Sequence, residues 1–232
     1  MGHIKPEIYN KFVPNHPKVF VETGTYYGGI PQLMLKDKSM DVFNKVYTIE
    51  LSIDACKIAS NRYSLFEKYN LDVTKFDEDT NEKDETFNGR KEFFDGKLIL
   101  IQGDSSEKLK DVLNEVNEPI CFWLDAHAGS KKSYARGGVD CPLIQELEVI
   151  KNHGIKDHFI AVDDSHLFGA KQKKDGEVIC DYSDITKEMV EKILKDINKD
   201  YKIEYISPYG QLMLISYFNE KLFISSNDWW NK

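Results

Sequence analysis

The 232-residue sequence lacks the features that mark membrane and secreted proteins. No apolar run approaches the roughly 20 residues that a membrane-spanning helix needs, and the opening MGHIKPEIYNKF contains no apolar core of a secretory signal. The four cysteines are scattered and form no C-x-x-C pair, which argues against a zinc ribbon or a dithiol redox centre. We therefore expect a soluble, cytoplasmic protein with reduced thiols and no membrane contact.

Positive charge is also scarce in this sequence. The 31 lysines and arginines are outnumbered by 39 aspartates and glutamates, which gives a formal net charge of -8 at pH 7. A charge of this sign repels a phosphate backbone, and no cluster of basic residues with interleaved aromatics offsets it. The composition therefore disfavours a nucleic acid as partner.

Short apolar runs that alternate with longer amphipathic segments are the main positive feature. This alternation is typical of a parallel sheet covered by helices on both faces. Two further runs, KIEYIS and QLMLISYF, flank the turn signal Pro208-Tyr209-Gly210 and predict an antiparallel C-terminal hairpin. The five runs that predict parallel strands are KVFVET (18–23), KVYTIE (45–50), KLILIQ (97–102), ICFWLD (120–125) and HFIAVD (158–163).

The whole chain, residues 1–232, is thus predicted to form a single α/β domain. Its sheet is expected to be Rossmann-like, doubly wound and mostly parallel, with seven strands when the C-terminal hairpin is included. One segment breaks the alternation: residues 72–96, DVTKFDEDTNEKDETFNGRKEFFDG, are acidic and without clear period. We interpret this segment as a mobile insertion before the third strand.

Acidic residues end or closely follow each of the five predicted parallel strands. Because such strand ends meet at one edge of a doubly wound sheet, these carboxylates are expected to gather around a ligand site. A structural role stays open for each of them: Asp104, with Glu107 three residues later, fits a helix cap, and Glu22 could hydrogen-bond turn amides. The residues concerned are Glu22, Glu50, Asp104, Asp125, Asp163 and Asp164.

The stretch VFVETGTYYGGIPQLML, residues 19–35, carries the clearest motif. A dinucleotide turn would read G-x-G-x-x-G, but Tyr26 stands two residues after Gly24, where a side chain obstructs the pyrophosphate. The pattern E-x-G-x-x-x-G-G instead resembles motif I of the class I S-adenosylmethionine-dependent methyltransferases. This resemblance covers residues 18 to 218 approximately and implies S-adenosylmethionine as cofactor.

The resemblance also implies roles for individual residues. Gly24, Thr25 and Gly28 would lie against the methionine part of the cofactor, with Glu22 nearby. Glu50, 50 − 22 = 28 residues after Glu22, would accept hydrogen bonds from the ribose hydroxyls, as a carboxylate can. In the segment LIQGDSSEKL, Asp104 and Ser105 would border the adenine, and Asp125 is also expected at the cofactor.

Two later stretches, FWLDAHAG and IAVDDSHLFG, narrow the resemblance to metal-assisted O-methyltransferases of the catechol, macrocin and cephalosporin-hydroxylase-like groups. In these groups a metal on acidic residues after the fourth and fifth strands holds the acceptor hydroxyl. The resemblance implies Mg²⁺ or Mn²⁺ on Asp125, Asp163 and Asp164, oxygen ligands that suit a hard cation. His127 and His166, each two residues beyond an aspartate, depart from the groups' pattern.

His127 has two interpretations, as the general base beside Asp125 or as a loop histidine that hydrogen-bonds a carboxylate. The sequence thus predicts catalytic roles for His127 and Asp125 and methyl transfer to a hydroxyl of a sugar, glycan or small natural product. Two rival hypotheses remain. One is a metal-independent N-methyltransferase of protein or nucleic acid, and the other is a non-catalytic cofactor-binding module.

Two further segments are predicted to bind ligands or partners. The loop AGSKKSYARGGVD, residues 128–140, is interpreted as a lid over the acceptor or as a solvated connection. Its polar and aromatic side chains are Lys131, Lys132, Tyr134 and Arg136. Trp229 and Trp230 near the C-terminus either tuck onto the domain or form a subunit contact in a homo-oligomer.

Overall fold

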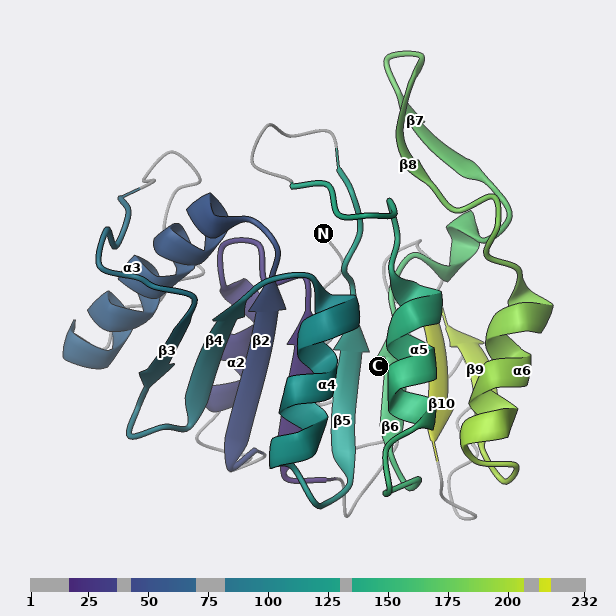
Figure 1. Ribbon diagram of the computed structural model, residues 1–232, viewed down its shortest axis with the longest axis horizontal. Coiled ribbons are helices and arrows are strands. Elements are labelled where there is room, and N and C mark those ends of the chain that lie inside the picture. The colour runs from purple at the N-terminus through teal and green to yellow at the C-terminus, as the bar shows by residue number, and fades with distance from the viewer. Residues whose placement is uncertain (1–16, 37–42, 70–81, 130–134, 207–212, 218–232) are drawn as a thin grey trace, which may run out of the picture.

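The computed structural model describes residues 17–36, 43–69, 82–129, 135–206 and 213–217 of the chain (Figure 1). The strands and helices alternate along most of this length, as the apolar pattern predicts. In chain order the elements are β1 (Val19–Thr23), α2 (Gly29–Lys36), β2 (Lys45–Glu50), α3 (Ile53–Tyr69), β3 (Arg90–Phe93), β4 (Leu98–Gln102), α4 (Ser105–Glu115), β5 (Ile120–Leu124), α5 (Leu143–Lys151), β6 (Phe159–Val162), the 3₁₀ turn η2 (Ser165–Leu167), β7 (Lys171–Lys174), β8 (Glu177–Asp181), α6 (Lys187–Ile197), β9 (Lys202–Ile206) and β10 (Met213–Tyr217).

One large sheet organises the molecule, with the strand order β3-β4-β2-β1-β5-β6-β10-β9. β4, β2, β1, β5 and β6 are parallel, whereas β10 is antiparallel to both β6 and β9. The mostly parallel sheet and the antiparallel C-terminal pair are therefore confirmed. The predicted count of seven strands is not, because the sheet has eight strands among the described residues.

The extra strand, β3, comes from the segment that the sequence assigns to a mobile insertion. Residues 72–81 of that segment lie outside the described part of the chain, but Arg90–Phe93 pairs antiparallel with β4. Phe87 and Phe93 are buried in the core, and Asp84 accepts hydrogen bonds from Ser60 and Lys91. The expectation of irregular chain is wrong for β3, because buried phenylalanines anchor a segment whose composition is otherwise polar.

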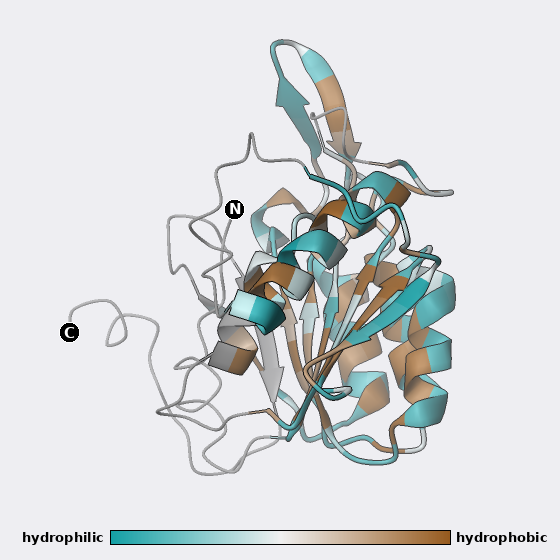
Figure 2. Cartoon of the chain, turned by 90° about the vertical axis from the view of Figure 1, so that its left-hand side faces the viewer, coloured by the Kyte–Doolittle hydropathy of each residue, from teal (hydrophilic) through white to brown (hydrophobic). Residues whose placement is uncertain are grey.

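Alternating strand residues supply two separate cores, one on each face of the sheet. Val19 and Val21 pack in the core beneath α4, α5 and α6, while Phe20 packs in the core beneath α2 and α3. A strand buried on both faces is what β1, at the centre of a parallel sheet, requires. Figure 2 shows the same division in the helices, whose apolar residues turn toward the sheet.

The hairpin β7–β8 stands apart from the large sheet and extends beyond the carboxyl ends of its strands (Figure 1). The sequence pattern does not predict this hairpin, because the β7 sequence KQKK has no apolar alternation. At its base, Gly169 donates hydrogen bonds to the carbonyls of Tyr182 and Ile185, which ties the two ends of the insertion together. In the described part of the chain, every helix is too short or too polar to cross a bilayer.

Candidate functional site

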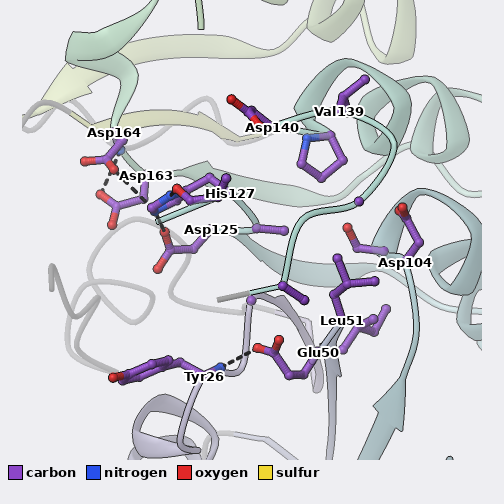
Figure 3. Close-up of a pocket in the computed structure, with 18 of the residues that line it drawn as sticks. Tyr26, Glu50, Leu51, Asp104, Asp125, His127, Val139, Asp140, Asp163 and Asp164 are labelled. Atoms are coloured by element: carbon purple, nitrogen blue, oxygen red, sulfur yellow. Dashed lines mark hydrogen bonds and ion pairs between the residues drawn. The ribbon is translucent and has the colours of Figure 1, made fainter. Parts of the chain in front are cut away.

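A cavity of about 230 Å³ lies at the carboxyl ends of the parallel strands. Its centre is at the end of β1. The neighbouring strands on the two sides of β1 are β2 and β5, so the strand order reverses its direction here. Ligands of doubly wound proteins bind at this topological switch point. Most of the predicted site residues line the cavity, as Figure 3 illustrates: Gly24, Glu50, Asp104, Ser105, Asp125, His127, Asp163 and Asp164.

The turn after β1 brings two strand ends into close contact. Gly24 has a φ of +88°, and a Cβ atom at this position would lie 2.5 Å from the carbonyl oxygen of Asp125. The end of β1 is thus held against the end of β5 by backbone atoms on both sides, so only glycine fits here. The glycine in the predicted motif is explained by this close approach.

The remaining motif residues lie beneath the turn and do not line the cavity. Glu22 is 1% exposed and accepts a 2.5 Å hydrogen bond from Thr48, whose hydroxyl also bonds that of Thr25. Burial raises the pKa of Glu22 well above its usual range. Gly28 packs against the ring of Tyr63. Glu22 thus has a structural partner, but this partner is the Thr48 hydroxyl on β2 and not the turn amides that the structural interpretation named.

Glu50 at the end of β2 is held by two backbone amides. Its Oε2 accepts from the amide of Tyr26 and its Oε1 from the amide of Ser52, both at 2.8 Å. Burial raises the pKa of the Glu50 carboxyl, and these amide donors oppose that shift. Each oxygen keeps a further lone pair, so the carboxylate can accept two more hydrogen bonds from a ligand.

Asp104 is the predicted helix cap and also lines the cavity. It is the N-cap of α4, where its Oδ1 accepts from the amide of Ser106 at 3.0 Å and from the Ser106 hydroxyl at 2.6 Å. Asp104 and the following Ser105, which is buried, also line the cavity. The helix cap therefore fixes an acidic side chain at the edge of the ligand site.

On the opposite side of the cavity, His127 lies between two carboxylates. Its Nε2 is 3.5 Å from Asp125 Oδ1 and 3.5 Å from Asp164 Oδ2, and its Nδ1 is 2.7 Å from the carbonyl oxygen of Ala128. A proton on Nδ1 satisfies that carbonyl and leaves Nε2 directed at the carboxylates.

The charge of His127 follows from these neighbours. Burial on its own would lower the pKa of the imidazole, but bonds to Asp125, Cys180 and the Ala128 carbonyl raise it well above its usual range. These bonds therefore favour the protonated form of the ring over the neutral form that a general base needs. The predicted role of His127 as general base stays a prediction.

Asp163 and Asp164 after β6 are both buried. Asp164 has a left-handed backbone, with a φ of +53°, and its amide donates to Asp163 Oδ1 at 2.9 Å. Burial and the neighbouring carboxylates Asp125 and Asp164 raise the pKa of Asp163 to about 8. Burial raises the pKa of Asp164 as well, although His127 opposes the shift. His166 Nδ1 is 3.8 Å from Asp164 Oδ1, at the rim.

The metal site implied by the resemblance is not supported by this geometry. Within the described ranges, no three carboxylate, imidazole or thiol side chains form a group that could hold a metal ion. Instead, the imidazole Nε2 of His127 lies 3.5 Å from a carboxylate oxygen of Asp125 and 3.5 Å from one of Asp164.

Part of the cavity wall comes from the loop 128–140, interpreted above as a lid or a solvated connection, and from the unpredicted hairpin β7–β8. Val139 and Asp140 of the loop and Gln172 of β7 line the cavity. Arg136 of the loop donates to Asp140 Oδ1 at 3.0 Å and to the carbonyl of Ile179 at 3.2 Å. No motif marks Gln172, which reaches the site from an insertion distant in sequence. Lys131, Lys132 and Tyr134, and the predicted packing or subunit contact of Trp229 and Trp230, lie outside the described residues.

Comparison with known proteins identifies the fold. No family model and no curated protein sequence matches the chain. A candidate O-methyltransferase from Klebsiella pneumoniae matches with a TM-score of 0.52 at 11% identity, covering 92% of this chain and 78% of the other. A candidate rRNA methylase from Clostridium thermocellum matches with a TM-score of 0.51 at 12% identity, covering 94% and 99%.

A third solved structure is the Podospora anserina methyltransferase PaMTH1 with SAH bound, with a TM-score of 0.48 at 13% identity over 92% of this chain and 76% of that one. The Klebsiella and Clostridium structures show that this chain has the fold of class I methyltransferases. The resemblance drawn from motif I is thereby confirmed at the level of the fold.

Proposed function

We propose that this protein is an S-adenosylmethionine-dependent methyltransferase that methylates a hydroxyl of a sugar, a glycan or a small natural product. The fold and the position of the cavity support the cofactor, and the chemistry of the acidic wall supports the acceptor. The cofactor would span the cavity from Gly24 to Asp104, and the acceptor would lie beside Asp125 and Asp164.

The carboxylate of Glu50 is the observation that carries the proposal. Two backbone amides orient it, and the residue lines the cavity, as Figure 3 shows. A cis diol offers two hydroxyl donors at the spacing of one carboxylate, which is what the ribose of S-adenosylmethionine presents. Because the carboxylate is already held in place, it loses little freedom when it binds.

The chemistry is a direct displacement. The acceptor oxygen attacks the methyl carbon, the carbon–sulfur bond breaks, and its electron pair remains on the sulfur of S-adenosylhomocysteine. Alignment of oxygen, methyl and sulfur supplies much of the rate. The hydroxyl proton must also leave, and we assign it to the carboxylate of Asp164, which lines the cavity.

Asp164 suits this role because its environment makes it a stronger base than a free aspartate. Burial raises the pKa of its carboxyl, and a base with a raised pKa takes a proton more readily. We take the ring of His127, 3.5 Å away, to be protonated, so that it keeps the carboxylate ionised and oriented before transfer. In this proposal His127 is a positioning residue, and Asp164 receives the proton.

The divalent cation that the resemblance implies has no place in this mechanism. The residues at the ends of β5 and β6 do not fit a metal as they stand, so each step uses protein groups alone. A chelator then becomes a direct test of the assignment.

The acceptor wall favours a polyhydroxy ligand. Asp140, Asp163 and Asp164 line it together with Gln172, whose Oε1 is buried without a hydrogen-bond partner among the described residues. The oxygens of Asp140, Asp164 and Gln172 accept hydrogen bonds from hydroxyl donors, and the carboxylates of Asp140 and Asp164 repel phosphate. The same acidity argues against a polynucleotide acceptor, despite the fold shared with a candidate rRNA methylase.

Calorimetric titration with S-adenosylhomocysteine tests the proposal. The wild type should bind, Glu50→Ala should lose most of the affinity, and Glu118→Ala, which removes an exposed carboxylate outside the cavity, should bind like the wild type. Absence of wild-type binding would refute the methyltransferase assignment. Once binding is established, transfer of a labelled methyl group to a panel of sugars and polyols identifies the acceptor. Transfer to protein or RNA alone would overturn the proposed class of acceptor.

A further inference from the structure

The segment 135–142, which we name the strap, crosses the cavity between its two sides. Its residues Ala135, Gly137, Val139, Asp140 and Pro142 all line the cavity. In Figure 3 the chain that leads to Val139 runs between Asp125 on one side and Asp104 on the other. The strap therefore faces both the predicted cofactor residues and the acidic acceptor wall.

Several hydrogen bonds fix one end of the strap. The carbonyl of Asp140 accepts from the amide of Ala128 at 2.7 Å, and Asp140 Oδ2 accepts from the amide of Asp181 at 3.1 Å. Arg136 bonds both Asp140 and the carbonyl of Ile179. The strap is thus attached to the loop after β5 and to strand β8, and α5 begins immediately after it.

The other contact of the strap is with the cofactor side, through Gly137. A Cβ atom on Gly137 would lie 2.8 Å from Asp104 Oδ2 and 3.5 Å from Leu51 Cδ2. Asp104 cannot move away freely, because its Oδ1 caps α4 through Ser106. A side chain at position 137 would therefore displace the strap or break the cap. The neighbouring Gly138 has open space at its Cβ position.

We infer that the strap is the outer wall of a purine-nucleoside subsite, and that Gly137 is the positioning residue that sets the distance of this wall from Asp104 and Leu51. Leu51 follows the ribose-binding Glu50, and Asp104 lies at the adenine end. The strap contacts both of them, so it encloses the space between them from the solvent side. This inference rests on the proposed function, since the nucleoside is that of S-adenosylmethionine.

A matched pair of glycine substitutions tests the inference. Gly137→Ala should weaken binding of S-adenosylhomocysteine about tenfold, the effect expected from one overpacked methyl group, while Gly138→Ala should leave it unchanged. Both positions are exposed, so both variants should fold; the melting temperature of Gly138→Ala should match that of the wild type, and that of Gly137→Ala should fall by no more than the loss of one helix cap explains. Equal affinity of the two variants, or tighter binding by Gly137→Ala, would overturn the inference.

A double-mutant cycle tests whether the loss of affinity in Gly137→Ala arises from its contact with Asp104. Asp104→Ser shortens the side chain that Gly137 faces, yet serine still caps a helix. If Gly137 acts through Asp104, Gly137→Ala should cost little in the Asp104→Ser background. A full tenfold loss in that background would contradict the contact. Failure of the wild type to bind would remove the proposed function itself, whereas normal wild-type binding with an unaffected Gly137→Ala would remove only the strap's role.

Discussion

The two halves of the cavity are held together in different ways. On the cofactor half, formed by the ends of β1, β2 and β4, backbone amides orient the side chains: Glu50 accepts from Tyr26 and Ser52, and Asp104 accepts from Ser106. On the acceptor half, formed by the ends of β5 and β6 with β7, side chains orient one another. There the imidazole of His127 lies between Asp125 and Asp164.

This difference has a consequence for what each half can tolerate. A carboxylate bound to amides loses little when a distant residue changes, because its partners belong to nearby turns. The acidic cluster depends on charge balance among buried groups, so removal of one member leaves another without a partner. Substitutions should therefore separate the halves, with binding lost on one side and turnover lost on the other.

The largest effect is expected from Asp164→Asn. The amide cannot accept the hydroxyl proton, and loss of a general base lowers kcat by about 10²–10⁴-fold. Affinity for S-adenosylhomocysteine should stay within about twofold of the wild type, because Asp164 lies on the acceptor half. Asp175→Asn, at an exposed and left-handed position of the hairpin β7–β8, is the control and should retain full turnover. Normal turnover of Asp164→Asn would show that the proton leaves by another route.

A second test concerns the point where the halves meet. Gly24→Ala places a methyl group 2.5 Å from a backbone oxygen that cannot rotate away, so the free energy of unfolding should fall by roughly 1–3 kcal/mol and the cofactor affinity should fall with it. Gly29→Ala, with open space at its Cβ and a position at the start of α2, should be neutral or slightly stabilising. Urea unfolding of both variants measures the contrast, and equal stability would mean that the strand ends separate easily.

A smaller effect should appear in the pH dependence of stability. The folded protein keeps a proton on Asp163 up to about pH 8, whereas an unfolded aspartate releases it near pH ~3.9. Between these two pH values the folded state therefore binds more protons than the unfolded state. The contribution of Asp163 to the free energy of unfolding falls as the pH rises across this range. Asp163→Asn should gain melting temperature relative to the wild type between pH 5 and pH 8 approximately.

Asp181 provides the control of opposite sign. Bonds to Lys171 and Ser183 lower the pKa of its carboxyl to about 2, so its contribution is present above the unfolded pKa and is lost only as the pH falls toward 2. Asp181→Asn should therefore show a constant difference from the wild type across the same range. A constant difference for Asp163→Asn as well would indicate that Asp163 is ionised in the folded state.

A similar division, between features fixed by local sequence and features fixed by distant partners, separates what the sequence predicts from what it misses. All seven predicted strands exist. The central parallel strands are buried on both faces and therefore read as continuous apolar runs such as VFV and LILI. β3, β7 and β8 were missed: β3 and β7 carry few apolar residues, and β8 pairs only with β7. Their positions depend on partners distant in sequence, which no local pattern reports.

The site shows the same limit. Gly24, Glu50 and Asp104 belong to short turns with recognisable spacing, and they line the cavity. Gln172 and Gly137 line it too, but they arrive from an insertion and a loop without a motif. The raised pKa of His127 could not be predicted from the sequence either, because it depends on Asp125 and the Ala128 carbonyl lying against the buried ring. A sequence pattern identifies a residue that local backbone geometry requires, whereas the charge on a buried group follows from the assembled site.

The smallest effect, no change at all, is expected from a chelator. If His127 supplies the positive charge between Asp125 and Asp164, turnover should be the same in excess EDTA as in excess magnesium. His127→Gln, which keeps a hydrogen-bond donor but removes the charge, should lower kcat and should not be rescued by magnesium. Loss of wild-type turnover in EDTA, restored by magnesium, would mean that the imidazole leaves this position in the working enzyme and that the acceptor half assembles around a metal. In that case the contact of His127 with the aspartates would exist only in the metal-free protein. The assignment of the cofactor half would not change.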